Sequence, residues 1–247
     1  MNPADRPPVV FVPGMLCDAD LWSAVAPRLP GRVVHVAITA PGIGGMAEQI
    51  LSAVEGPFVL AGLSLGAIAG FEVARRAPER LAGFCAMSTN AGAPTPEQLA
   101  GWAELAGRTG CGEFETVVIE EILPTMFAGR VPAPALGEQF LAMARRIGPA
   151  VFRAQLAAQA TRRDALAAIA GLHCPVLALC GARDALCPPE FHRAIAAQAR
   201  DSAFRVLPDA GHLLPVEAPE ATAASLADWL CEIPSLQLYE EPPCPRS

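Results

Sequence analysis

The sequence predicts an α/β fold: a mostly parallel sheet of about six strands flanked by helices, with a helical insertion before the last two strands. Three observations predict it. Short apolar runs rich in β-branched residues alternate with longer Ala- and Leu-rich stretches of helical period. The 247 residues suffice for one such core. Between residues 90 and 172, helical patterns occur without a convincing strand.

Each predicted strand is a short apolar run that ends in residues which turn a chain into a loop. Strands of a buried parallel sheet are apolar on both faces, as these are. The predicted strands are residues 9–12, 32–37, 58–61, 81–87, 176–180 and 203–207. The helices expected between and after them are residues 19–28, 46–54, 65–75, 189–198 and 219–231, of which the last two begin at a proline.

The interval without strands predicts a separate helical layer. Helical patterns at residues 96–108, 113–123, 134–147 and 149–161 fill it, and a structureless loop of this length would be implausible. We therefore expect residues 1–89 and 173–233 to form the core and residues 90–172 a helical cap. Residues 234–247, which contain four prolines, are expected to form a flexible tail.

Composition excludes several function classes. A net charge of −7 is unfavourable for binding a phosphate backbone, so no nucleic-acid partner is expected. Every basic residue is Arg, and without Lys the chain cannot perform Schiff-base chemistry or form a Walker-type phosphate loop. No apolar run reaches the roughly 18 residues of a membrane span, and residues 1–6 do not resemble a secretory signal. We expect a cytoplasmic protein without a membrane partner.

The cysteines do not indicate a metal site. The eight cysteines form no C-x-x-C pair and have no histidine at zinc-finger spacing. Cys85, Cys174 and Cys180 fall in or beside apolar runs, where a thiol behaves as a small hydrophobe. We therefore expect no metal and no cofactor, and a small molecule as the binding partner; the oligomeric state is not determined by the sequence.

A candidate nucleophile, Ser64, lies in the sequence Gly62-Leu63-Ser64-Leu65-Gly66. An apolar strand precedes this motif, and a helix rich in small residues follows it. A serine on such a sharp turn projects its hydroxyl, while the glycines let the backbone pass closely. The helix N-terminus directs free N–H groups toward a developing oxyanion. The alternative is a helix-capping serine between two packing glycines, so the motif requires partners.

A serine hydroxyl needs a neighbouring base, and histidine is the usual one. His212 follows the predicted strand 203–207, at the same edge of the sheet as Ser64. The other histidines fit the role less well. His35 lies inside a strand, His173 precedes a strand, and His192 lies in a helix of surface type.

The base needs an acid that orients it and stabilises its charged form. Asp184 follows the predicted strand 176–180 at the same edge of the sheet. Asp209 competes for the role, but it lies only three residues before His212 and is expected to cap its own loop. The chain order Ser64, Asp184, His212 is the order expected of strand–turn–helix serine hydrolases.

With these residues the sequence resembles the α/β-hydrolase fold superfamily over about residues 8–232. Three more segments carry the resemblance: FVPGML at 11–16, APGIGG at 40–45 and GHLLPVEAPE at 211–220. The resemblance implies that the backbone N–H groups of Met15 and Leu65 form an oxyanion hole and that residues 90–172 cover the pocket. The chain has Pro13 where most members have His. Compared with the full fold of the superfamily, we expect the first two strands to be missing from its sheet.

The resemblance and the motifs together predict a serine hydrolase that cleaves an ester, thioester or lactone of a small, largely apolar substrate through an acyl-enzyme. A carbon–carbon bond hydrolase or a cofactor-free perhydrolase using the same triad remains an alternative. The residues expected at the substrate are Leu16, Met126, Phe127, Phe140 and Leu213. No anion clamp is expected, since the paired arginines at 145–146 and 162–163 are typical of solvated helix surfaces.

Two rivals from other classes remain. The pattern Gly42-x-Gly44-x-x-Ala47 follows a strand, as in dinucleotide-binding proteins, but no acidic residue ends the next strand to hold a ribose. A non-catalytic small-molecule binder or receptor would use the same pocket without turnover. Labelling of Ser64 by a fluorophosphonate distinguishes this binder from an enzyme.

Overall fold

The computed structural model describes residues 6–127, 131–233 and 236. Its centre is a six-stranded sheet of order β2-β1-β3-β4-β5-β6, in which every neighbouring pair is parallel. The predicted parallel sheet is confirmed, although β2 is shorter than the predicted strand 32–37. The strands are β1 (Val9–Val12), β2 (Val33–His35), β3 (Phe58–Leu63), β4 (Leu81–Met87), β5 (Val176–Gly181) and β6 (Ser202–Leu207).

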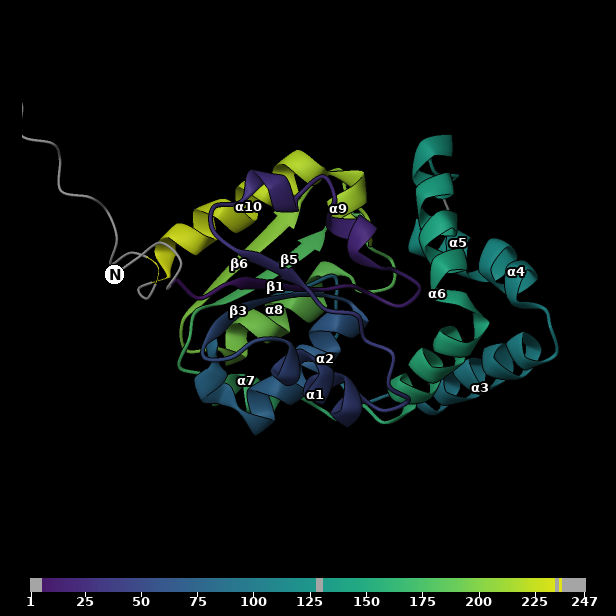
Figure 1. Ribbon diagram of the computed structural model, residues 1–247, viewed down its shortest axis with the longest axis horizontal. Coiled ribbons are helices and arrows are strands. Elements are labelled where there is room, and N and C mark those ends of the chain that lie inside the picture. Colours follow the sequence, from purple (N-terminus) through teal and green to yellow (C-terminus); the bar gives the residue numbers. More distant parts are fainter. Residues whose placement is uncertain (1–5, 128–130, 234–235, 237–247) are drawn as a thin grey trace, which may run out of the picture.

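Helices cover both faces of the sheet (Figure 1). On one face lie α1 (Ile43–Ala53), α2 (Leu65–Arg76), α7 (Leu166–Ala170) and α8 (Pro189–Gln198); on the other lies α10 (Pro219–Glu232). Successive strand side chains point to opposite faces. Accordingly Val10 and Leu60 pack with α1 and α2, whereas Phe11 and Val59 pack with Trp229 of α10.

The predicted helix 19–28 is wrong. The segment forms two 3-10 turns, Ala19–Trp22 and Ala26–Arg28, which pack on β1 and α10. Pro27 explains the break, because a proline has no N–H for the carbonyl four residues earlier and its ring collides with that carbonyl. The apolar residues still reach the core, where the Trp22 ring stacks on Phe11 with 4.3 Å between ring centroids.

The chain between β4 and β5 is helical, as its pattern predicts. It contains α3 (Pro96–Gly110), α4 (Phe114–Val117), a π-helical segment (Val118–Ile122), α5 (Leu123–Met126), α6 (Pro134–Ala160) and α7. Non-helical backbone at Gly148, with φ 74°, interrupts α6 between the two predicted helices 134–147 and 149–161. The arrowheads of β5 and β6 point toward α3–α6, so these helices lie beyond the carboxyl ends of the strands (Figure 1).

The strand order determines where a site can form. From β1 the chain moves out to β2 and then returns to β3 on the other side of β1. Loops that leave β1 and β3 in opposite directions open a crevice at the carboxyl ends of a parallel sheet. None of the helices within the described ranges is long and apolar enough to cross a membrane. The predicted tail, residues 234–247, lies outside the described residues except for Leu236.

Candidate active site

Ser64 lies at this crevice, between the end of β3 and the start of α2. Its φ of 52° is in the left-handed region, which costs a non-glycine residue about 1–3 kcal/mol. Neighbouring groups hold the strained turn. The Ser64 N–H donates to the Met87 carbonyl at 2.8 Å, and the Ser64 carbonyl accepts from the Ile68 N–H and from the Thr89 hydroxyl, at 3.0 and 3.1 Å.

Two glycines make room for this turn. A side chain at Gly66 would overlap the Val12 carbonyl oxygen in β1, and one at Gly62 would overlap the backbone of Ala67 in α2. Both positions therefore require glycine because the backbone approaches too closely for a Cβ atom. The G-x-S-x-G spacing thus serves the packing of α2 against β1 and β3.

His212 and Asp184 are in direct contact and are both buried. His212 Nδ1 lies 2.9 Å from Asp184 Oδ2, while Asp184 Oδ1 accepts the N–H groups of Leu186 and Cys187 at 3.0 and 2.9 Å. Because an ionised carboxylate only accepts hydrogen bonds, the ring proton of neutral His212 lies on Nδ1. Its Nε2 then carries a lone pair that is free to accept a proton.

The loop that carries His212 is held by a residue that sequence reasoning did not single out. Glu217 accepts the N–H groups of Gly211 and Leu213, at 3.0 and 2.9 Å, and so clamps the backbone on both sides of His212. Asp209, the competing acid, instead pairs with Arg183 at the surface, with 2.7 Å between Asp209 Oδ1 and Arg183 Nη2.

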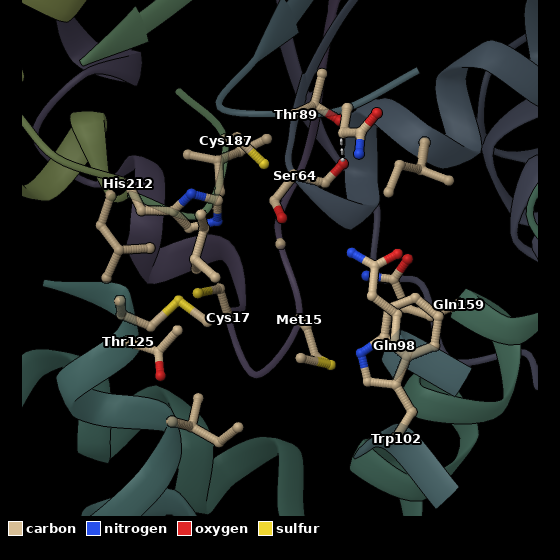
Figure 2. A pocket seen from close by; sticks show the side chains of 18 of the residues that line it. Met15, Cys17, Ser64, Thr89, Gln98, Trp102, Thr125, Gln159, Cys187 and His212 are labelled. Carbon is tan, nitrogen blue, oxygen red and sulfur yellow. Dashed lines mark hydrogen bonds between the residues drawn. The ribbon is translucent and has the colours of Figure 1, made fainter. Parts of the chain in front are cut away.

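Ser64 and His212 line one pocket of ≈ 280 Å³ between the sheet and helices α3–α6. Figure 2 shows both side chains at its wall, with the Ser64 hydroxyl on the side toward the His212 ring. Met15, Met126 and Leu213 also line it. A pocket of this size, mostly apolar with a few polar groups, suits a small organic ligand.

Three residues expected at the substrate lie elsewhere. Leu16, Phe127 and Phe140 are at most 2% exposed, belong to the apolar core and are absent from the pocket lining. Apolar periodicity identifies a buried side chain but cannot distinguish a pocket wall from a packed interior. The pocket instead has polar members that the sequence pattern did not mark, among them Thr89, Gln98, Gln159 and Arg162.

The two expected oxyanion donors lie at adjacent strand ends. Met15 follows β1 and borders the pocket, and Leu65 is the first residue of α2. As the first helical residue, Leu65 has no intrahelical acceptor for its N–H. Among the described residues, neither the Met15 N–H nor the Leu65 N–H donates a backbone or side-chain hydrogen bond that would occupy it.

The loop after β1 is held from α6. The Leu16 N–H donates to Gln155 Oε1 at 3.0 Å, and Gln155 Nε2 donates to the Ile38 carbonyl at 3.2 Å, all within the protein interior. Leu16 is a second residue with left-handed backbone, with a φ of 61°. The hydrogen bond from its N–H to Gln155 helps to hold this conformation. The buried Gln155 side chain thus fixes the backbone next to Met15.

His192 is buried rather than exposed on its helix. Its Nε2 accepts the Thr89 N–H at 2.9 Å, and Thr89 in turn donates its hydroxyl to the Ser64 carbonyl. Burial lowers the pKa of His192 to about 4. His192 is therefore neutral near pH 7 and acts as a hydrogen-bond acceptor behind the Ser64 turn.

One group within the described residues has the spacing of a metal site: Asp184, Cys187 and His212. Two of its members already bond to each other through His212 Nδ1 and Asp184 Oδ2. Burial raises the pKa of the Cys187 thiol well above its usual range. The contact between Asp184 and His212 thus gives both residues a role in which no metal takes part.

Known proteins resemble this chain in sequence and in fold. The sequence model of the alpha/beta hydrolase family matches residues 9–225. The pimeloyl-[acyl-carrier protein] methyl ester esterase of Aromatoleum aromaticum is 26% identical over 91% of this chain and 98% of its own length. A thermophilic esterase from Thermogutta terrifontis, solved with malate bound, is 29% identical with a TM-score of 0.83, covering 92% of this chain and 90% of that one.

A third similarity concerns the fold alone. The enol-lactonase from Burkholderia xenovorans has a TM-score of 0.80 at 18% identity and covers 92% of both chains. The six-stranded sheet and the helices on its two faces therefore match proteins of low sequence identity along almost their whole length.

Proposed function

The chain belongs to the alpha/beta hydrolase family and is a hydrolase; from this premise we propose that it cleaves carboxylic esters of small, largely apolar substrates through an acyl-enzyme. Ser64 is the nucleophile, His212 the general base and Asp184 the residue that orients it. The observation that carries the proposal is the 2.9 Å contact between His212 Nδ1 and Asp184 Oδ2 beside the pocket that Ser64 lines. The two esterases similar to this chain support the choice of an ester bond.

In the first half-reaction Ser64 Oγ attacks the ester carbonyl carbon while His212 Nε2 takes the hydroxyl proton. Asp184 stabilises the imidazolium that forms and keeps its ring orientation. The tetrahedral intermediate then collapses, His212 returns the proton to the leaving alcohol oxygen, and the acyl group stays bonded to Ser64.

The carbonyl oxygen becomes negatively charged in the tetrahedral intermediate. The N–H groups of Met15 and Leu65 bind it, and the α2 N-terminus adds its positive dipole end. Donors of this kind are worth on the order of 3–4 kcal/mol each in the transition state. Gln155 supports the Met15 side of this site by holding the neighbouring Leu16 N–H.

In the second half-reaction His212 removes a proton from water, which attacks the acyl carbon. The second tetrahedral intermediate releases the carboxylic acid, and the proton returns to Ser64 Oγ. In this proposal the helices of residues 90–172 act as the cap: they close the pocket from the side opposite the sheet and contribute Trp102 and Met126 to its wall.

Substitution of the nucleophile tests the proposal. We expect Ser64→Ala to reduce kcat for p-nitrophenyl butyrate by roughly 10⁴-fold or more, because a triad that loses its nucleophile retains only oxyanion binding. Ser52→Ala, at an exposed serine in α1, is the matched control and should keep full activity. Ester turnover that survives in Ser64→Ala would refute Ser64 as the nucleophile.

Labelling separates an enzyme from a binder that uses the same pocket. A fluorophosphonate should modify the unchanged protein at Ser64 and should not modify Ser64→Ala, as read by mass spectrometry of the intact chain. A folded protein that fails to label and that hydrolyses no ester, thioester or lactone would favour the non-catalytic binder.

A further inference from the structure

Arg162 follows α6 and is buried at the pocket, in contrast to the solvated side chain that its paired sequence predicts. It is only 7% exposed and lines the same pocket as Ser64 and His212. The neighbouring Arg163 is exposed. The two adjacent arginines therefore have opposite environments, and only Arg162 can act on a ligand in this pocket.

The partners of the Arg162 guanidinium are all uncharged. Its Nη1 donates to Gln159 Oε1 at 3.3 Å and its Nη2 to Gln98 Oε1 at 2.8 Å, while the guanidinium carbon lies 5.2 Å from the centre of the Trp102 ring. Its Nε is buried without a hydrogen-bond partner. The hydrogen-bond acceptors of Arg162 within the described residues are the two glutamine amides and no carboxylate, and burial lowers its pKa.

As far as the described residues go, this arrangement places a positive charge in the wall of a pocket without a counter-ion. A buried charge is costly unless it is paired, and guanidinium pairs best with a planar carboxylate. The other charged cap side chain at the pocket wall, Glu121, is already engaged by Arg108. Within the described part of the chain, the wall of this pocket therefore offers Arg162 no free carboxylate, and an anionic ligand would supply the counter-ion.

The two glutamines that bind Arg162 offer hydrogen-bond donors to the pocket. Because guanidinium only donates, both amide oxygens must face Arg162, and the amide NH₂ groups are then available to other acceptors. Gln98 Oε1 is held further by the Thr95 N–H in the capping box of α3. Figure 2 shows Gln98, Gln159 and Trp102 grouped on the side of the pocket away from His212, with the amide nitrogens directed toward Ser64.

We propose that Arg162, Gln98 and Gln159 form a subsite for a carboxylate at the end of the substrate distant from the bond that is cleaved. The inference rests on the proposed esterase function and narrows its substrates to esters that are apolar along the chain but end in a carboxylate, the monoesters of short dicarboxylic acids. The ester carbonyl lies at Ser64, and the free carboxylate takes hydrogen bonds from the Gln98 and Gln159 amides in the field of Arg162.

Paired substrates measure the subsite. Monomethyl glutarate and methyl 5-methylhexanoate differ only in that a carboxylate replaces an isopropyl group of similar shape, and monomethyl succinate and adipate vary the length. A pH-stat measures kcat/KM from the acid that each hydrolysis releases. For at least one chain length we expect kcat/KM of the charged ester to exceed that of the neutral ester, in which isopropyl replaces the carboxylate, by about tenfold or more. A hydrogen bond to a charged group has an effect of this size.

Two variants and a control assign the preference to Arg162. Arg162→Gln removes the charge, and Gln98→Glu keeps the Thr95 capping box but supplies a carboxylate that neutralises Arg162. We expect the ratio of the two kcat/KM values to fall about tenfold in both variants. Arg163→Gln removes the same charge from the exposed neighbour and should keep the ratio. If Arg162→Gln does not fold, the ratio measured for Gln98→Glu still tests whether the charge of Arg162 causes the preference.

Binding without turnover separates this proposal from the esterase function. Calorimetry should show that Ser64→Ala binds monomethyl glutarate and that the additional change Gln98→Glu weakens this binding at least about tenfold. Equal kcat/KM for charged and neutral esters would overturn the subsite and leave the esterase function standing. If no ester is hydrolysed, the esterase function fails; calorimetric binding that needs the Gln98 amide then supports the subsite, and absence of binding overturns it.

Discussion

At the scale of single residues, His192 links the protonation of the protein to its stability. It is fully buried and accepts the Thr89 N–H, so a proton on Nε2 would break this hydrogen bond. Its folded pKa of about 4 lies below the value of about 6.5 of an exposed histidine. The unfolded chain therefore binds the proton first, and the stabilisation present above about pH 6.5 is lost as the pH falls toward 4.

His192→Gln tests this linkage, because the glutamine oxygen can replace Nε2 as the acceptor and does not titrate. Between pH 7 and pH 4 we expect the unchanged protein to lose up to about 3 kcal/mol more unfolding free energy than the variant. Urea unfolding at a series of pH values measures the difference. His173→Gln, at an exposed histidine, should keep the pH dependence of the unchanged protein, and parallel curves for His192→Gln would contradict the prediction.

Gln155 is a positioning residue next to the proposed oxyanion site. Gln155→Leu leaves the buried Leu16 N–H and Ile38 carbonyl without partners, each at a cost of about 1–3 kcal/mol. We expect lower stability and, under conditions where the variant is folded, a tenfold or larger fall in kcat with little change in KM. Steady-state kinetics with a p-nitrophenyl ester measure kcat and KM separately. Gln139→Leu, at a half-buried glutamine in the same helix, should alter neither constant by more than about twofold.

The positions of Ser64, Asp184 and His212 at one edge of the sheet could be predicted from the sequence. The burial of the polar side chains around them could not. Ser64, Asp184 and His212 each follow an apolar run, and the carboxyl ends of parallel strands meet at one edge, so their common location follows from topology. The burial of His192 depends on which face of α8 packs inward, and the burial of Arg162 depends on how the chain turns after α6 ends. A polar residue type does not predict either placement, because histidine and arginine are mostly found at the surface.

At the scale of elements, the break in α6 depends on Gly148. Its φ of 74° is strained for any residue with a side chain, although no atom lies within 4 Å of a Cβ built there. We expect Gly148→Ala to lower the unfolding free energy by about 1–2 kcal/mol. Gly101→Ala, in the regular helix α3 with equally open space, should raise it by about 0.5–1 kcal/mol. Urea unfolding compares the two, and the same sign for both would refute the argument.

Prolines explain where predicted helices and observed helices agree or differ. Pro96, Pro134, Pro189 and Pro219 begin helices as predicted, because a first-turn residue needs no N–H. The predicted helix 113–123 is instead divided into α4, a π-helical segment and α5. Pro124 in α5 has no N–H for the carbonyl four residues earlier, and the widened segment precedes it.

At the scale of the whole molecule, the helices inserted between β4 and β5 share an apolar cluster with the sheet. Phe140, Phe152 and Val117 of these helices belong to the cluster that contains Phe11 of β1 and Trp229 of α10. Such a continuous interior couples the unfolding of its parts. Phe140 accordingly belongs to the folding core, in contrast to the role at the substrate that the sequence suggests.

Phe140→Ala tests this coupling. We expect a loss of roughly 3–5 kcal/mol of unfolding free energy, because a buried aromatic side chain is removed from a packed interior. Far-UV circular dichroism and tryptophan fluorescence should shift to the same lower urea midpoint, since Trp102 reports α3 and Trp229 reports α10. Leu99→Ala, at an exposed leucine, should shift the midpoint little. Two separate transitions in the variant would show that the inserted helices unfold on their own.

The bond between Gln155 and the loop after β1 links the pocket wall to the backbone beside Met15. Gln159, the pocket-lining residue of α6, lies one helical turn after Gln155, whose amide oxygen accepts the Leu16 N–H. We therefore expect a ligand that pushes Gln159 outward to displace this oxygen as well and to withdraw support from the proposed oxyanion donor. Such a ligand would lose turnover after it has bound, and it would act as an inhibitor.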